Sequence, residues 1–260
     1  DGDSAPVFPR TLFVGGANSK ATLVEVFETL DDSSAALIIG VADVIAKDGA
    51  KLDYLCVQDL NTSSKQVHLG TNCAHKDATI NAGFVNVGGA WVRNESINRM
   101  MDTGSHTEVY AANLATGIQE FDQRTLQIHE AQHTTSNLLF KNALYDKSRC
   151  IFGGLIQVRE GAHHTDSYQT CRNLLGSDDA EANAMPGLEI GADQVKCSHG
   201  STSGQISDEE IFYLQARGIP ADEARQMISF GFLNETLDAI SCDDLQEWAA
   251  NRIAQKFARI

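Results

Sequence analysis

The sequence predicts a mainly β protein, in which a β-solenoid is followed by a small C-terminal helical domain. Short runs that alternate apolar and polar residues, rich in Val, Ile, Thr and Leu, fill the chain from about residue 10 to residue 196. These runs recur at a nearly constant interval. After Gly204 the alternation gives way to apolar residues at helical spacing.

The strands are indicated by runs such as Thr22 to Val26, Leu52 to Val57, Leu126 to His129 and Leu155 to Val158. Each run is too short for a helix of ordinary length, and Gly, Asn and Asp separate one run from the next. Proline cannot donate a hydrogen bond to a neighbouring strand, and it is rare in this region.

A repeat is seen when each small residue that precedes an alternating run is marked. The marks are Ala21, Ala50, Ala78, Thr107, Thr134 and Ala162, at intervals of 27 to 29 residues. Repeats of about 20 to 50 residues indicate solenoids, propellers or arrays, and a propeller blade needs about 40 residues or more. We therefore expect stacked coils in which Ala21, Ala50 and Ala78 point inward at equivalent positions. A β-sandwich with regularly spaced strands is the alternative.

The C-terminal region carries signals for the ends of three helices. Ser207 and Glu210 form a capping-box pattern, in which each side chain satisfies a backbone N–H of the first turn. Gly218 ends this helix, and Pro220 fits the first turn of the next. Ser241 caps a third helix, whose apolar stripe is either core or partner surface. The stripe consists of Leu245, Trp248, Ala249, Ile253 and Phe257.

Charge and cysteine content limit the partners and the compartment. The formal net charge of −15 disfavours nucleic acid and anionic membranes, which bind surfaces rich in Lys and Arg. Six cysteines are scattered, without a CxxC pair, in a chain too long to need disulfides. No apolar run is long enough to span a bilayer, and no signal-peptide pattern is found. We expect a cytoplasmic protein that binds neither nucleic acid nor membrane.

Residues His129 to His133 match the HExxH pattern of zinc peptidases, which needs a helix to bring both histidines to one ion. The residues before and after the match alternate or favour β structure. A strand would separate the two histidines by about 13 Å, too far to share one zinc ion. We predict no metal site here, and a zinc peptidase is kept as an alternative.

Other metal-competent or acidic residues fit turns better than catalytic sites. His163, His164 and Asp166 lie near Cys171, but their spacing matches no zinc pattern. Acidic pairs could belong to a β-helix enzyme acting on polysaccharides, yet consecutive carboxylates are typical of solvated turns. The pairs are Asp31 and Asp32, Asp178 and Asp179, and Asp243 and Asp244. No nucleophile elbow, P-loop or dinucleotide fingerprint is found, which disfavours an intrinsic ATPase.

Cys197 and His199 lie where the strand pattern passes to the helices. Two residues apart on one strand, they would share a face, and both thiolate and imidazole bind iron. The same pair also fits a small buried residue beside a hydrogen-bonded histidine. The spacing alone does not decide between these interpretations.

The residues around this pair resemble the SufD branch of the SufB/SufD family, which acts in SUF iron–sulfur cluster assembly. Residues 193–202, DQVKCSHGST, are similar to the family segment D-x-V-K-C-[ST]-H-G-A-T, with Ser201 in place of the usual alanine. Residues 208–219, DEEIFYLQARGI, are similar to D-E-x-x-F-Y-L-x-[AS]-R-G-I. Residues 173–190 and 129–136 resemble its N-L-L…P-x-L-x-I and H-x-A-x-H-T-T-S segments, which gives the HExxH match a non-catalytic explanation.

The resemblance implies a right-handed parallel β-helix and a non-catalytic scaffold subunit. We expect the β-helix over residues 1–203 and the helical domain over residues 204–260. Family members pair with a SufB-like paralogue and bind a SufC-like ATPase through the helical domain, which implies a SufB–SufC2–SufD complex. No tightly bound cofactor is implied, because ATP enters with the ATPase and the iron–sulfur cluster is transient. Pairing as a homodimer is the alternative for the chain alone.

The same resemblance implies roles for individual residues. Cys197 and His199 match positions at the cluster-assembly interface, where they would hold iron transiently and no metal tightly. Cys171 falls near a cysteine of the SufB paralogue that is thought to receive sulfur, although an inert buried cysteine is the preferred interpretation. The residues implied in docking the ATPase are Ile211, Phe212, Tyr213, Leu214, Arg217, Phe230 and Phe232.

Overall fold

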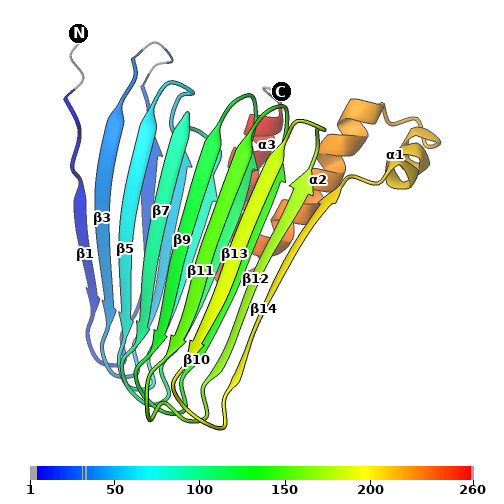
Figure 1. Cartoon of the computed structure of the whole chain (residues 1–260). Helices are drawn as coiled ribbons and strands as arrows, with labels where there is room; N and C mark the ends of the chain where they lie inside the picture. Colours follow the sequence, from blue (N-terminus) through cyan, green and yellow to red (C-terminus); the bar gives the residue numbers. More distant parts are fainter. Residues whose placement is uncertain (1–4, 31, 33, 259–260) are drawn as a thin grey trace.

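The computed structural model describes residues 5–30, 32 and 34–258, and this part of the chain confirms a parallel β-solenoid followed by helices. Two sheets of seven strands face each other (Figure 1). The odd-numbered sheet contains β1 (Arg10–Gly15), β3 (Leu37–Ala46), β5 (Lys65–Ala74), β7 (Trp91–Met100), β9 (Glu120–His129), β11 (Arg149–Val158) and β13 (Glu181–Ile190). The even-numbered sheet contains β2 (Lys20–Glu28), β4 (Lys51–Asp59), β6 (Thr79–Asn86), β8 (His106–Ala115), β10 (Thr135–Leu144), β12 (Asp166–Leu175) and β14 (Lys196–Gln205).

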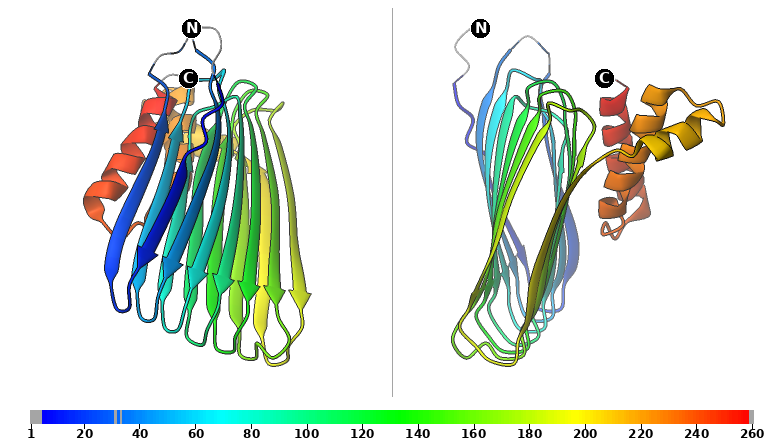
Figure 2. Two further views of the ribbon diagram at one scale, coloured as in Figure 1. Left: turned by 90° about the vertical axis from the view of Figure 1, so that its left-hand side faces the viewer. Right: turned by 45° about the vertical axis from the view of Figure 1, so that its right-hand side comes forward.

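Each coil of the solenoid contributes one strand to each sheet. The odd strands follow one another in order across one sheet, and the even strands do so across the other. Figure 2 shows the two sheets as opposite walls of a flattened tube. The parallel register of the even sheet advances by 27 to 31 residues per coil, for example from Lys51 to Thr79 and from Thr79 to His106.

The predicted alanine repeat is correct in its period and partly wrong in its phase. Ala50 and Ala78 occupy equivalent positions in the turns that precede two even strands, and both are fully buried. Ala21 lies inside β2, in register with buried Leu52, two residues after that turn position. Ser19 takes the turn position in the first coil. Of the six marks, Ala50, Ala78 and Thr134 share this turn position, whereas Ala21 and Thr107 lie two residues after it and Ala162 lies three residues before it. Small side chains of several types fit the turn, so residue size alone does not fix the phase.

The space between the sheets is filled by apolar side chains and by a column of asparagines. Asn86, Asn113, Asn142 and Asn173 occupy one position in successive even strands. Each of the first three donates its Nδ2 hydrogen to Oδ1 of the next asparagine across 2.6 to 2.7 Å. The column ends in the last coil, where Asn173 Nδ2 donates to Ser203 Oγ across 3.0 Å. These bonds link coils that are adjacent in the solenoid.

Three helices follow the last strand in the described part of the chain: α1 (Asp208–Gln215), α2 (Ala221–Leu237) and α3 (Asp243–Phe257). Helices α2 and α3 cover the outer face of the even sheet, whereas α1 projects beyond the last coil (Figures 1 and 2). The predicted apolar stripe of the third helix is core, because it packs on this sheet. Its members are buried Ala249, Ile253 and Phe257, with Leu245 and Trp248 partly buried beside them.

The N-cap position predicted at Ser207 is correct although its side-chain bond is missing, and the cap predicted at Ser241 is wrong. Ser207 precedes α1 and accepts the Ile211 N–H with its backbone carbonyl, but its side chain makes no capping bond. Cys242 is the residue that precedes α3. The Ser241 hydroxyl donates instead to Asp53 Oδ2 of β4 across 2.7 Å. This bond connects the helical domain to the solenoid.

The change from strand to helix falls between Gln205, the last residue of β14, and Asp208, the first residue of α1. The division into domains at residues 203 and 204 stays a prediction. Among the described residues, no helix combines the length and the apolar character needed to cross a membrane.

Candidate functional site

The last coil leaves both sheets with an open edge. Strand β13 ends the odd sheet and β14 ends the even sheet, so each pairs with a strand on one side only. Strands β1 and β2 form the corresponding edges at the other end. Unpaired backbone N–H and C=O groups along an edge strand are a template for a further strand.

Cys197 lies near the start of β14, at the open end of the solenoid. Its backbone is in register with buried Ser167 of β12, which places its side chain on the inward face. The thiol packs against the small apolar cluster of Ile156 and Val158. Burial and the nearby Asp166 carboxylate raise the pKa of this thiol above its ordinary value. It is therefore a protonated thiol at neutral pH.

His199 follows two residues later on the same face of β14. It is in register with Gln169 of β12, which is fully buried, yet His199 itself is exposed because no coil follows. The structure thus brings Cys197 and His199 together on the inward face of an edge strand. An imidazole and a thiol at this spacing can reach one metal-containing ligand that approaches the open end.

Cys171 is not part of the pair at the open edge. It lies on β12, in register with Ser201, and is fully buried. Its sulfur lies 3.6 Å from Asn142 Nδ2 and 3.8 Å from Asn173 Oδ1, within the asparagine column. Burial raises the pKa of the thiol to about 12, so it carries no thiolate at neutral pH. The geometry favours an inert, structural cysteine.

The HExxH match does not form a metal site. His129 ends β9 and is fully buried, with its ring nitrogens 2.7 Å from Thr134 Oγ1 and 2.9 Å from Ser136 Oγ. His133 lies in the following turn with φ of 56° and stacks on His164, ring centroids 4.7 Å apart. A turn, rather than the predicted continuous strand, separates the two histidines. No helix therefore brings the two histidines to one ion, and the absence of catalysis at this match stays a prediction.

Some of the other polar candidates lie in turns, as predicted, whereas Asp166 begins β12 and one acidic pair begins α3. His163 and His164 occupy the turn between β11 and β12. Asp178 and Asp179 are exposed in the turn before β13, while Asp243 and Asp244 are exposed in the first turn of α3. Asp31 lies outside the described residues. Among the residues that are described, no group of three or more His, Cys, Asp or Glu side chains is arranged to hold a metal ion.

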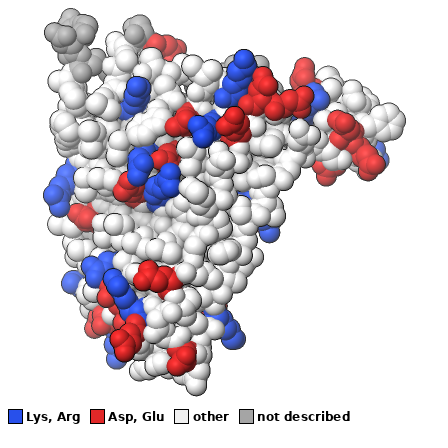
Figure 3. Space-filling view, in the orientation of Figure 1, with Lys and Arg blue, Asp and Glu red and all other residues white. Residues whose placement is uncertain are grey.

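The residues implied in ATPase docking do not form one surface. Phe212 and Tyr213 of α1 are exposed, with relative exposures of 71% and 57%, and the Arg217 guanidinium lies 3.5 Å from the Tyr213 ring centroid. Ile211 is buried and Leu214 partly buried beneath them. Acidic side chains gather over the first turn of the same helix (Figure 3). The exposed part of α1 is therefore an aromatic and acidic surface.

The two remaining docking candidates lie elsewhere. Phe230 and Phe232 of α2 are partly buried and pack against the core between the helices and the even sheet. The Lys141 ammonium lies 4.6 Å from the centroid of the Phe232 ring. A resemblance between sequences assigns these aromatics to a helix but does not show which face of the helix they occupy.

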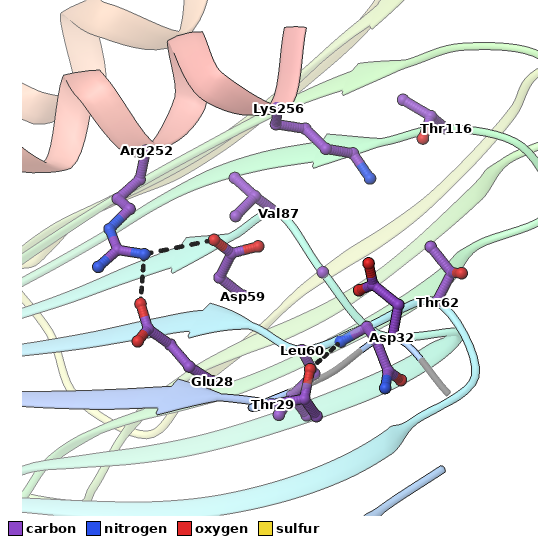
Figure 4. Close-up of a pocket in the computed structure, with 12 residues that line it drawn as sticks. Glu28, Thr29, Asp32, Asp59, Leu60, Thr62, Val87, Thr116, Arg252 and Lys256 are labelled. Atoms are coloured by element: carbon purple, nitrogen blue, oxygen red, sulfur yellow. Dashed lines mark hydrogen bonds and ion pairs between the residues drawn. The ribbon is translucent and has the colours of Figure 1, made fainter. Parts of the chain in front are cut away.

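A polar cleft of about 750 Å³ between α3 and the solenoid was missed by the sequence analysis (Figure 4). Arg252 reaches into it from α3 and forms ion pairs with Glu28 and, at 3.5 Å, with Asp59. Both carboxylates belong to the first two even strands. These ion pairs hold α3 against the N-terminal coils, and no sequence motif indicates them.

Fold and site together define a class of protein: an end-open β-solenoid that presents a thiol and an imidazole at its last coil and carries a helical domain on one sheet. The family model described as SUF system FeS cluster assembly, SufBD core domain, matches residues 1–232. The chain belongs to this SufBD core family.

Several curated proteins are similar to the chain. The iron–sulfur cluster assembly protein SufD of Escherichia coli (strain K12) is 34% identical over 242 residues, which cover 92% of this chain and 56% of that protein. An iron–sulfur cluster assembly SufBD family protein of Mycobacterium tuberculosis is 29% identical over 235 residues, covering 86% and 59%. One from Synechocystis sp. is 27% identical over 255 residues, covering 94% and 56%. The chain thus spans somewhat more than half the length of these relatives.

Proposed function

We propose that this protein is a non-catalytic scaffold subunit for iron–sulfur cluster assembly in the cytoplasm. It pairs through the edges of β13 and β14 with a SufB-like paralogue, and it binds a SufC-like ATPase through α1. Iron and sulfide are cargo, and the partner hydrolyses ATP. Membership of the SufBD core family supports the role in cluster assembly.

The open edge beside Cys197 and His199 is the observation that carries this proposal. Both sheets end in the same coil, so a partner solenoid could continue both sheets at once by strand addition. A partner coil stacked on β14 would enclose the two side chains and exclude water from them. A second copy of this chain offers the same edge, so a homodimer is the competing assembly.

The chemistry of the pair supports a shared rather than a self-contained site. Iron–sulfur clusters are commonly held by four protein ligands, whereas this edge supplies one thiol and one imidazole. The remaining ligands would come from the paired subunit. Because the pKa of Cys197 is raised, binding of iron to its sulfur would release a proton.

The test is to express the chain with a SufB-like paralogue and a SufC-like ATPase, in wild-type form and as His199→Ala. The matched control is Ser198→Ala, which changes the neighbouring exposed residue on the outward face of the same strand. Light scattering after gel filtration gives the composition, and iron and sulfide assays give the cluster content. We expect His199→Ala to assemble fully and to lose most of its cluster, and Ser198→Ala to match the wild type.

Two results would contradict the proposal. Full cluster content in His199→Ala would show that His199 is not needed for cluster assembly. If the wild-type chain formed stable homodimers and did not associate with the paralogue, the protein would pair with itself and not with the paralogue.

A further inference from the structure

Lys141 is a buried lysine on the outer face of the even sheet. It belongs to a row of register partners across that sheet, in which Val57, Val85 and Ala112 form an apolar floor on one side of it. Arg172 follows it on the other side. Helix α2 covers the Lys141 side chain, which is only 2% exposed. A lysine is rarely buried to this extent unless its charge is paired.

Lys141 finds its partners in one helical turn of α2. Its ammonium donates to the backbone carbonyl of Phe232 across 2.9 Å and to the carboxylate of Glu235, and it lies over the Phe232 ring. Glu235 also lies 3.8 Å from Arg172. The hydrogen bond from Lys141 and the charges of both cations lower the pKa of Glu235. One carboxylate of α2 is thus held by two successive coils of the solenoid.

The two partners differ in their access to water. Lys141 is 2% exposed, whereas Glu235 is 55% exposed. Removing the carboxylate would leave an ammonium buried without a counter-charge, which is costly. Removing the lysine would leave a carboxylate that water can solvate. The lysine can therefore stay charged and covered only while α2 places Glu235 beside it.

We propose that Lys141 is a positioning residue, whose charge fixes the orientation of the helical domain on the solenoid through Glu235. The consequence for function rests on the proposed function above. Helix α2 leads directly back to α1, and Arg172 pairs with Thr202 of the edge strand β14. The ion-pair cluster of Lys141, Glu235 and Arg172 therefore determines the position, relative to the open edge, of an ATPase bound to α1.

The test measures the orientation directly in the isolated chain, without any partner. One spin label is placed on Cys242, an exposed residue that directly precedes α3, and another on Asn183→Cys at an exposed position of β13, with Cys73 and Cys197 changed to serine. Pulsed electron resonance then gives the distribution of distances between the two labels. The variants are Glu235→Gln, Lys141→Met and the double variant. The control is Asp222→Asn, which alters a 95% exposed carboxylate of the same helix.

We expect the distance distribution of Glu235→Gln to be at least about twofold broader than that of the parent, because the buried ammonium moves the helix to reach water. The double variant should be narrower than Glu235→Gln, because no buried ammonium is left to move the helix, but broader than the parent, because no charge pair holds it. Such a rescue would not follow from a purely steric role of Glu235. Asp222→Asn should match the parent.

An unchanged distribution in Glu235→Gln, or a double variant as broad as Glu235→Gln, would overturn the proposal. The distance measurement tests the positioning role of Lys141 independently of the proposed function. If the wild-type chain failed to capture the ATPase, the proposed docking role of α1 would be contradicted. The positioning role of Lys141, measured in the isolated chain, would be unaffected. If Glu235→Gln captured the ATPase through the unaltered α1 but assembled less cluster, both would be supported.

Discussion

Asn113 donates its Nδ2 hydrogen to Oδ1 of Asn142 across 2.6 Å in the fully buried interior of the solenoid. Asn142 in turn donates to Asn173 at the same distance. A carboxamide both donates and accepts, so a stack of asparagines satisfies itself from coil to coil without water. Each member is therefore needed by two neighbours.

Asn142→Ala should lower the free energy of unfolding by about 3 kcal/mol, because it leaves a donor of Asn113 buried without a partner and leaves Asn173 Oδ1 with only the weak Cys171 thiol donor. Urea denaturation followed by circular dichroism measures the change. The matched control is Asn183→Ala, at an exposed position of β13, with an expected change within about 0.5 kcal/mol. Equal effects of the two substitutions would show that the column contributes little.

Gly88 is required by the close approach of another backbone. A Cβ atom at this position would lie 2.1 Å from the carbonyl oxygen of Leu60 and 2.3 Å from its nitrogen. Gly88→Ala should therefore separate the two backbones and cost about 3 kcal/mol. Gly16→Ala is the control, because a Cβ there meets no atom within 4 Å. Similar melting temperatures for both variants would contradict this assignment.

Stability should fall as the pH is lowered below 6.5, in part through His129. Burial lowers the pKa of His129 to about 3, so between pH 6.5 and pH 3 the unfolded chain binds a proton that the folded chain does not. The contribution of this histidine at pH 4.5 is a loss of about 2 to 3 kcal/mol. Urea denaturation at pH 7 and pH 4.5 measures it.

His129→Gln should be less stable than the wild type at pH 7, because its two hydroxyl partners are no longer both satisfied, but should lose less stability between pH 7 and pH 4.5. Part of the pH dependence will remain, since burial also lowers the pKa of His68 to about 4. Ser198→Ala, at an exposed position, should keep the wild-type pH dependence. An unchanged slope in His129→Gln would mean that His129 titrates normally when folded.

Tyr213→Glu should weaken capture of the ATPase at least about tenfold while leaving the melting temperature within about 2 °C, because the side chain is mostly exposed on α1. Pull-down by a tagged ATPase measures capture. Ile118→Glu is the control, with an 85% exposed side chain in the turn between β8 and β9. Equal capture by both variants would place the docking surface away from α1.

The solenoid could be predicted from the sequence because both of its signals depend only on the order of residues along the chain. Alternation along a strand and a constant interval between coils are both visible without knowing what lies opposite. The phase of the repeat was less secure, because Ser19, Ala50 and Thr134 all fit the same turn position. Helix caps failed for a related reason: the Ser241 hydroxyl found a tertiary partner in Asp53 that competes with the helix N-terminus.

The site could be predicted only in part. The spacing of Cys197 and His199 predicted a common strand face, and the family resemblance assigned them to the site. The fold places that face at an open edge. Phe232 was assigned to docking although it faces the solenoid, since helical spacing does not say which partner covers a face. Lys141 was missed because an outward-facing lysine is typical of a solvated strand. Only the packing of α2 makes it a buried charge.

Hydrogen–deuterium exchange of the β14 amides, with and without the SufB-like paralogue, tests the pairing edge most directly. Amides of β14 that point away from β12 bond to no strand in the isolated chain and should exchange quickly. We expect the paralogue to slow their exchange at least about tenfold and to leave the β1 and β2 edges unchanged. Protection confined to β1, β2 or the helices, with β14 still exchanging quickly, would contradict assembly through the edge that carries Cys197 and His199.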